Sequence, residues 1–361
     1  MSCMVSVIIP AYNSEKYIDR CINGVLKCTD LDIEVIVIDD GSTDKTFSVV
    51  NSLAESEPRI KVYTQENQGV SKARNRGLSY ATGKYVIFSD SDDMLQGENL
   101  KKLVDFAENN DSDLVAFCRI NCYGNGNRVE YLPKGDVLVV ADNYQLAFSK
   151  TILNQNNFGW SSCNKLFKRE IIKNNNICFL DYKIINSEDR LFNLNYFMNV
   201  SKVAFFDDCC FYNFVRDDSL SHAKCFPDSV KRNVKAFEYV CDYAGGLPDT
   251  VRYKLLRHYF VSFLNNVVVL ELSVNKVGFK LSFRGFRNAI DGMYEVLKSK
   301  SITDMFNAEK GIYYCDSGFK YKMLNTLILN HRWYGLAAII LFGYVKFTDI
   351  FVGIKSKLKG K

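Results

Sequence analysis

The sequence predicts an α/β protein with a doubly wound, mostly parallel central sheet flanked by helices, followed by a mainly helical C-terminal region. Up to about residue 90, short continuous apolar runs alternate with segments whose apolar residues recur at helical spacing. From about residue 227 onward this alternation stops, and apolar, aromatic-rich helical faces take over. Strand–helix alternation of this length favours parallel strands joined by crossover helices.

The elements can be placed in chain order. The expected strands are Val5–Pro10, Ile33–Ile38, Ile60–Thr64, Tyr85–Ser89, Asp113–Arg119, Val137–Val140 and Val203–Asp207. The expected helices carry Ile18 to Leu26, Phe47 to Ala54 and Val70 to Ala81, begin again at Leu100, and recur near Tyr144–Leu153 and Asp189–Met198. The DDGSTD stretch after the second strand supplies three candidates, Ser42, Thr43 and Asp44, for the cap of the second helix.

A chain of 361 residues with 47% hydrophobic residues is long for one compact domain. We expect a catalytic domain over 1–225, a helical accessory region over 226–332 and an apolar, basic tail over 333–361. Trp333–Val345 is uncharged but shorter than the about 20 residues that span a bilayer. Five lysines against one aspartate follow it, which suits a helix lying on an anionic membrane surface. The alternative is an ordinary packed helix with a solvated tail.

Composition limits the partners and the location. The twelve cysteines are scattered and form no CxxC pair, which indicates reduced thiols. The N-terminus lacks the basic region and the long apolar run of a signal peptide, so we expect a cytoplasmic protein, peripheral at the inner face of the membrane. The tail carries +4 of the formal charge of +5, and no nucleic-acid partner is expected. Three histidines cannot build a histidine-rich site, so a metal would be magnesium or manganese on carboxylates.

Polar clusters follow three of the expected parallel strands. They are Tyr12–Asn13, Asp39–Asp40 and Asp90–Asp93. Ligands of doubly wound sheets bind at the carboxyl ends of the strands. Three aspartates within four positions repel one another and favour a bound cation. No glycine-rich phosphate loop follows the first strand, so the phosphates of a bound nucleotide would need that cation.

Several motifs together resemble one enzyme family. They are SVIIPAYNSEKYIDRCI, VIVIDDGSTDKT, ENQGVSKARNRGLSYATGKYVIFSDSDD, WSSCNKLFKREII and SEDRLFNLNYF, in this order. Over roughly residues 4–225 the chain is similar to the family 2 glycosyltransferases of the GT-A fold. The resemblance implies a nucleoside-diphosphate-sugar donor, most simply a UDP-sugar, a divalent Mn²⁺ or Mg²⁺ ion, and inversion at the anomeric carbon.

The resemblance also implies roles for particular residues. Pro10, Tyr12 and Asn13 would line the base, Asp40 would bond its imide N–H, and Asp39 would shape the turn. Lys72 and Arg74, with Arg76 as a further candidate, would lie near the donor. Asp90 and Asp92 would serve the ribose and the metal, with Asp92 and Asp93 as closest metal contacts and His222 as an extra ligand. Asp189 would be the catalytic base and Glu188 the second choice, while Ser187 could cap their helix.

Three alternatives bear on the function. A haloacid-dehalogenase-like phosphatase also begins from a strand ending in DxD, but it needs Thr or Val where this chain has Met94. A sugar-nucleotide-binding or scaffolding relative without turnover stays open. Processive polysaccharide synthases carry QxxRW, and the LNHRW stretch here lacks the glutamine. The resemblance therefore favours transfer of a single sugar to a glycan or lipid-linked acceptor in surface polysaccharide synthesis.

Overall fold

The computed structural model describes residues 3–131, 137–140, 147, 151–152, 161–185, 187–216, 229–247, 251–252, 255–256 and 259. The chain divides into two compact units, residues 1–222 and 223–361. The expected helix near Tyr144–Leu153 falls mostly outside the described residues. His222 and the tail over 333–361 fall wholly outside them.

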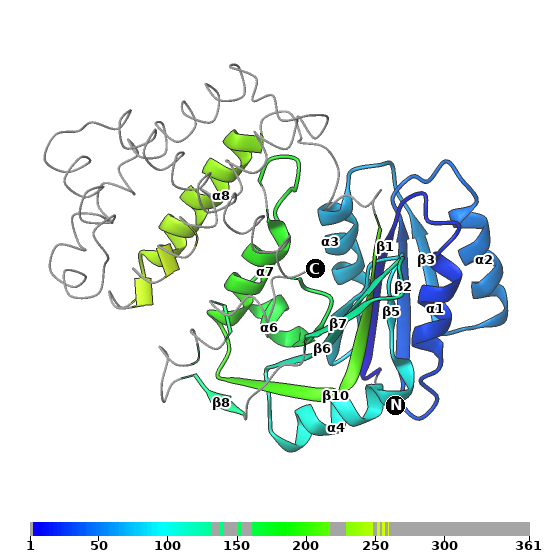
Figure 1. Cartoon of the computed structure of the whole chain (residues 1–361), viewed down its shortest axis with the longest axis horizontal. Coiled ribbons are helices and arrows are strands. Elements are labelled where there is room, and N and C mark those ends of the chain that lie inside the picture. Colours follow the sequence, from blue (N-terminus) through cyan, green and yellow to red (C-terminus); the bar gives the residue numbers. More distant parts are fainter. Residues whose placement is uncertain are drawn as a thin grey trace, which may run out of the picture. The chain divides into compact units, whose positions relative to one another are not determined.

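The N-terminal unit alternates strands and helices in its first half, as the sequence predicted (Figure 1). The strands are β1 Val5–Ala11, β2 Ile33–Asp39, β3 Ile60–Thr64, β4 Tyr85–Phe88, β5 Met94–Leu95, β6 Leu114–Tyr123, β7 Arg128–Tyr131, β8 Leu138–Val139, β9 Lys165–Lys168 and β10 Lys202–Val215. The helices are α1 Ile18–Leu26, α2 Thr46–Ser56, α3 Val70–Tyr80, α4 Leu100–Asn109, α6 Arg169–Asn174 and α7 Glu188–Phe197, with a short 3₁₀ turn at Gly97–Asn99. In the second unit, α8 covers Ser229–Ala244.

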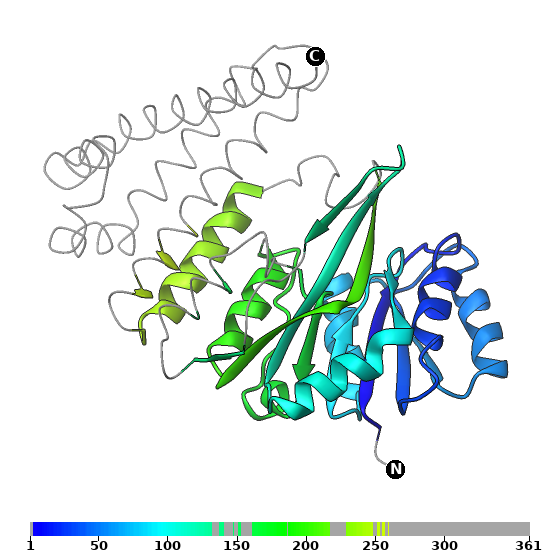
Figure 2. The same ribbon diagram turned by 60° about the horizontal axis from the view of Figure 1, so that its bottom comes forward.

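The central sheet has the order β3-β2-β1-β4-β9-β6-β10-β5, and β7 and β8 pair with β6 and β10. The longest pairings, β1 with β2 and β6 with β10, are parallel, and β6 and β10 run side by side in Figure 2. The sheet is nevertheless mixed, because β9 lies antiparallel between β4 and β6. The strand order changes direction between β1 and β4. β4 ends at Phe88, two residues before Asp90.

Helices cover both faces of the sheet. In Figure 1, α1 and α2 lie on one face and α3, α6 and α7 on the other. Gly77 lets α3 approach β1, because a Cβ there would lie 2.3 Å from Ile8 Cγ2. An aromatic cluster joins β4 to α7: the rings of Phe179 and Phe192 stack with centroids 4.1 Å apart, and Phe88 meets both edge-on. This packing fixes α7 beside the strand that leads to the aspartates.

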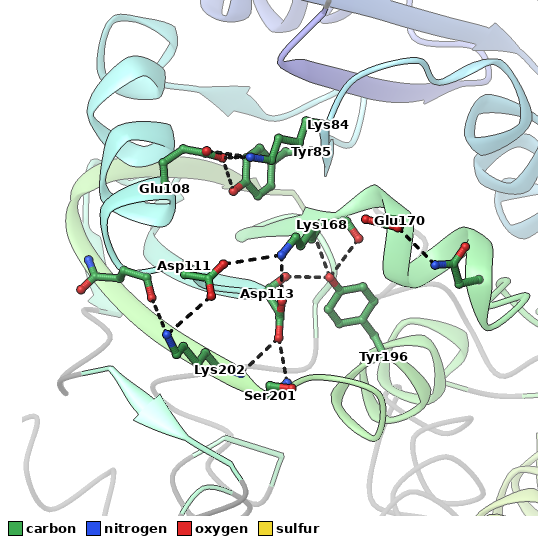
Figure 3. A network of polar contacts seen from close by, with 12 residues as sticks. Lys84, Tyr85, Glu108, Asp111, Asp113, Lys168, Glu170, Tyr196, Ser201 and Lys202 are labelled. Atoms are coloured by element: carbon green, nitrogen blue, oxygen red, sulfur yellow. Dashed lines mark hydrogen bonds and ion pairs between the residues drawn. The ribbon is translucent and has the colours of Figure 1, made fainter.

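A polar network lies at the end of the sheet away from Asp90–Asp93, where β6 and β10 begin and the antiparallel β9 ends. Figure 3 shows Asp113, which precedes β6, accepting the main-chain N–H groups of Ser201 and Lys202 and the ammonium of Lys168. Tyr196 of α7 donates its hydroxyl to the main-chain oxygen of Asp113 at 2.7 Å. These contacts anchor β6, β9 and β10 at the end of the sheet away from the aspartate loop.

Two details of the sequence prediction change. The cap position of the second helix is Lys45, without a side-chain cap hydrogen bond, and not Ser42, Thr43 or Asp44; Asp44, one residue before the cap, accepts the N–H of Thr46 at 2.9 Å. The strand predicted at Val203–Asp207 continues to Val215, across an irregularity between Phe206 and Cys210. No helix among the described residues is long and apolar enough to cross a membrane.

Candidate active site

The three aspartates after β4 point to three different partners. Asp93 is 1% exposed; its two oxygens accept the side-chain amide of Asn213 and the main-chain N–H of Phe214, both at 2.9 Å. Burial and the nearby charges of Asp90 and Asp92 raise the pKa of Asp93 to about 8. With both oxygens turned into β10, Asp93 holds the loop in place. The metal contact expected of Asp93 stays a prediction, since each of its oxygens already accepts one hydrogen bond from β10.

Asp92 keeps a partly exposed carboxylate near the carboxyl end of β4, as does Asp90, whose side chain is 38% exposed. The side chain of Asp92 is 24% exposed, and its Oδ2 accepts the guanidinium of Arg216. Burial raises the pKa of Asp92, and the charge of Asp90 adds to this. No group of three metal-ligating side chains occurs among the described residues. The oxygen chemistry of Asp92 still fits Mg²⁺ or Mn²⁺, because Mg²⁺ commonly takes one or two carboxylates together with substrate phosphates.

Arg74 of α3 bridges Asp90, in the loop after β4, and the predicted base. Its side chain is 4% exposed, with Nη2 donating to Asp90 Oδ1 at 2.7 Å and Nη1 to Asp189 Oδ1 at 2.6 Å. Glu188 Oε1 lies 3.9 Å from the same Nη1. The guanidinium also lies 5.2 Å from the ring centre of Phe179. Arg74 therefore contacts the acids, where the sequence led us to expect a donor contact.

Asp189 presents one bonded and one open oxygen. Oδ1 accepts both Arg74 and the hydroxyl of Ser162, the latter at 3.1 Å, while Oδ2 has no hydrogen-bond partner among the described residues. Burial raises the pKa of Asp189, and the positive charge of Arg74 lowers it. Burial and the charge of Asp189 raise the pKa of Glu188 to about 7. Of the two acids, Asp189 is the one that Arg74 contacts at hydrogen-bond distance, 2.6 Å against 3.9 Å for Glu188.

The start of α7 is shaped by an unusual backbone. Ser187 precedes the helix in the left-handed region with φ +65°, and its hydroxyl makes no capping hydrogen bond. Ser187 thus stands at the predicted cap position, but the predicted side-chain hydrogen bond to the helix is not formed. Helix N-termini favour negative charge, which suits Glu188 and Asp189 in the first turn.

Asp39 and Asp40, the two neighbouring aspartates at the end of β2, differ in their contacts. Asp40 is 3% exposed, and it accepts the main-chain N–H groups of Gln68 and Gly69 and the side chain of Gln65. Asp40 therefore shapes the turn. Asp39 is also buried, but its Oδ1 has no hydrogen-bond partner. An orphaned buried acceptor at this edge indicates a group completed by a ligand.

The remaining predicted donor residues divide into exposed and structural ones. Tyr12 is 48% exposed after β1, whereas Pro10 is buried within β1. Asn13 adopts φ +48° and accepts the N–H of Thr43 at 2.9 Å, so it joins the first two loops. Lys72 is exposed on α3. The guanidinium of Arg76 donates to the main-chain oxygen of Thr64, which gives Arg76 a structural contact.

Sequence reasoning missed one charged group of the site. Arg216, one residue beyond β10, reaches Asp92 from 124 positions away. Its partner Tyr17 precedes α1, and the guanidinium lies 4.3 Å from the centre of that ring. The basic residue is visible in FYNFVRDD, but only the pairing of β10 with β5 brings it to the aspartates.

Comparisons with known proteins identify the family of the chain. The family model "Glycosyl transferase family 2" matches residues 6–175. An uncharacterized glycosyltransferase, EpsJ of Bacillus subtilis, is 32% identical over 57% of this chain and 59% of its own length. Glycosyltransferase GlyG of Streptococcus pneumoniae is 30% identical over 58% of this chain and 69% of its own length. The chain thus spans less than two thirds of EpsJ.

Two further likenesses extend over more of the chain. Cholesterol galactosyltransferase of Borreliella burgdorferi is 28% identical over 82% of this chain and 84% of its own length. The crystal structure of Staphylococcus aureus TarS 1–349 in complex with UDP-GlcNAc superposes with a TM-score of 0.68, at 22% identity, over 96% of this chain and 91% of that one. The last likeness concerns the fold alone. From the family model, the similarity to GlyG and the shared fold, we conclude that the chain belongs to the family 2 glycosyltransferases and has the GT-A fold.

Proposed function

We propose that the protein is an inverting glycosyltransferase that moves a single sugar from a nucleoside-diphosphate-sugar, a UDP-sugar in the first instance, to a hydroxyl of a glycan or lipid-linked acceptor. One observation carries the proposal. Asp189, at the start of α7, is tied through the buried Arg74 to Asp90 of the donor loop, and one of its carboxylate oxygens is open. A base and a donor site are thereby held at a fixed separation.

The donor would lie along the carboxyl ends of β1, β2 and β4. Tyr12 offers an exposed aromatic face to the base, and the unpartnered Oδ1 of Asp39 suits an imide N–H. This assigns to Asp39 the contact that the sequence suggested for Asp40. Asp90, whose Oδ1 is held by Arg74, is the carboxylate we propose for the ribose. That the solved neighbour TarS was crystallised with UDP-GlcNAc supports a UDP-sugar.

Asp92 is the residue we propose to hold Mn²⁺ or Mg²⁺, and His222, outside the described residues, stays a candidate second ligand. When bound, the cation neutralises the negative charge that collects on the leaving diphosphate. Asp93 fixes the position of Asp92 through its bonds to Asn213 and Phe214.

The transfer itself follows from the position of Asp189. Its open Oδ2 takes the proton of the acceptor hydroxyl while the acceptor oxygen forms its bond to the anomeric carbon. The bond from that carbon to the diphosphate breaks on the opposite side, and the nucleoside diphosphate leaves with the electron pair, which inverts the configuration. The charge of Arg74 favours the ionised form of Asp189, because it opposes the rise in pKa caused by burial. Glu188, with its pKa raised to about 7, is the weaker candidate at neutral pH.

The acceptor rests on analogy. The sterol named for the Borreliella burgdorferi relative and the poly(ribitol-phosphate) named for Staphylococcus aureus TarS are, respectively, a lipid and a surface polymer. We place this protein in surface-glycan synthesis on that basis, at the cytoplasmic face of the membrane. Contact with the membrane through residues 333–361 stays a prediction, to be tested by flotation of the full chain and of a chain truncated before Trp333 with anionic vesicles.

The experiment for the function is a panel of nucleotide sugars with Mn²⁺ or Mg²⁺. Release of nucleoside diphosphate and thermal stabilisation are measured for each donor. Release from one donor class that depends on the metal supports the proposal. Stabilisation without release from any donor, with and without crude acceptor lipids, would indicate a sugar-nucleotide-binding relative instead. Undiminished release in EDTA would refute the metal dependence.

A further inference from the structure

The end of β10 is fastened to the aspartate loop by several independent contacts. Phe211 and Tyr212 pair with the two residues of β5, directly after the aspartates. The next residues of the strand, Asn213 and Phe214, bond both oxygens of Asp93. Arg216 follows two positions later. The path of β10 therefore delivers the Arg216 side chain to Asp92.

Two cation–aromatic pairs cross between α1 and the end of β10. The guanidinium of Arg216 lies 4.3 Å from the ring centre of Tyr17, and that of Arg20 lies 3.7 Å from the ring centre of Phe214. Arg20 also donates to the main-chain oxygen of Asp92, whereas Arg216 bonds its carboxylate. Each element thus supplies one cation and one ring. Of the two pairs, the one with the Tyr17 ring is the one that positions Arg216 beside the carboxylate of Asp92.

The ion pair between Arg216 and Asp92 is one that a divalent cation can replace. The two side chains are 26% and 24% exposed, so solvent reaches both. Partly exposed ion pairs contribute little net stability, and a divalent ion competes directly for the same carboxylate oxygen. Arg74 at the neighbouring Asp90 is different, because its side chain is only 4% exposed and it spans two acids.

We propose that Arg216 is the resident counter-ion of Asp92 in the empty enzyme and becomes a ligand of the donor diphosphate when a divalent cation takes its place. This inference rests on the proposed function. The guanidinium is a planar fork that matches phosphate oxygens in pairs. The ring of Tyr17 keeps it close to the loop after release from the carboxylate. Before the donor binds, Arg216 balances the negative charge of Asp92. After binding, its guanidinium places a positive charge beside the diphosphate.

The test compares the full chain with its Arg216→Gln, Arg216→Lys and Arg20→Gln variants. Mn²⁺ affinity without nucleotide is measured from the electron paramagnetic resonance signal of free Mn²⁺, and UDP affinity with saturating Mn²⁺ by calorimetry. Arg216→Gln should bind Mn²⁺ about two- to fivefold more tightly, because its competitor is gone. It should bind UDP about tenfold more weakly, because a charge-assisted contact is lost.

The other two variants separate exchange from a general effect of charge. Arg216→Lys keeps the charge but lacks the fork, so its Mn²⁺ affinity should equal that of the wild type while UDP binding is weaker. Arg20→Gln removes an equally close cation that does not touch the carboxylate and should leave Mn²⁺ affinity unchanged. Unchanged Mn²⁺ or UDP affinity in Arg216→Gln, or equal tightening in Arg20→Gln, overturns the proposal. A wild-type chain that binds neither Mn²⁺ nor UDP would instead contradict the proposed function.

Discussion

Replacing Arg74 tests how the donor loop and the base are joined. The guanidinium holds Asp90 and Asp189 at 2.7 and 2.6 Å, and its side chain is 4% exposed. Removing one partner of a buried ion pair costs about 3–5 kcal/mol. The lower end applies here, because the side chains of Asp90 and Asp189 are 38% and 25% exposed. A domain of 150–250 residues loses about 2–4 °C in Tm for each kcal/mol. Arg74→Met should therefore lower the Tm by about 10 °C.

The same change should alter the chemistry in a defined way. Because the charge of Arg74 lowers the pKa of Asp189, its removal raises that pKa. A base must be ionised to act, so activity is lost as pH falls through its pKa, and the acid limb of the kcat profile should move to higher pH. Arg74→Lys keeps one charge but cannot span both acids. We expect kcat to fall by about 10²-fold from misplacement of the base.

The assay combines three measurements on each variant. They are the Tm, the affinity for the donor, and the release of nucleoside diphosphate over about two pH units on either side of neutrality. Arg76→Met is the matched control, because Arg76 is a neighbouring cation on α3 that contacts a main-chain oxygen instead of an acid. Donor affinity should survive in Arg74→Lys. Donor affinity that falls in step with kcat, at an unchanged pH profile, would place Arg74 on the donor and refute the positioning role.

Three further predictions concern the surrounding structure. Burial raises the pKa of Glu34, but hydrogen bonds from Lys61, Ser6 and Thr82 outweigh this effect and lower the pKa to about 2. The ionised Glu34 therefore stabilises the fold above about pH 5, and this stabilisation is lost on acidification towards pH 2. The free energy of unfolding of Glu34→Gln, from denaturant titrations, should be about 3 kcal/mol lower than that of the wild type at pH 7 and equal to it near pH 2. A difference from the wild type that stays constant with pH would contradict this. Gly69→Ala should lower the Tm and weaken UDP binding, because φ is +95° and the new Cβ would lie 2.1 Å from Tyr182 Cε1; a wild-type Tm would show that the loop relaxes freely. Asp39→Asn should weaken UDP binding with little change in Tm, and Asp40→Asn should do the reverse, since Asp40 holds two main-chain N–H groups; the opposite pattern would restore the base contact to Asp40.

The strands of the first half could be predicted because the apolar pattern within each segment is enough to indicate a buried strand. Each of β1, β2 and β4 is a continuous apolar run that the structure buries completely. β9 could not be predicted this way. It is four residues long and includes the buried Lys165, whose ammonium donates to the main-chain oxygen of Ser161 at 2.6 Å. A short strand that buries a charge is stabilised by tertiary partners, which leave no periodic signal.

Site residues were predictable as a group but not one by one. The clusters after β1, β2 and β4 do meet at one edge of the sheet, as parallel strands require. Which aspartate of a cluster faces the site depends on partners far away in sequence, such as Asn213 for Asp93. Adjacent residues at a strand end point in different directions, so Asp40 bonds the turn while Asp39 keeps an unpartnered oxygen. Arg74 and Asp189 are 115 positions apart, and only the fold brings them together.

The account depends most on Asp189 as the general base, and one comparison tests it most directly. Turnover and donor affinity are measured together in Asp189→Asn, with Glu188→Gln as the matched control from the same helical turn. Asparagine keeps the shape but cannot accept the proton, so turnover should fall by about 10²–10⁴-fold. Donor affinity should stay at the wild-type value, because the proposed nucleotide contacts lie on other loops. Near-normal turnover in Asp189→Asn would contradict the account, and its loss in Glu188→Gln alone would transfer the role to Glu188.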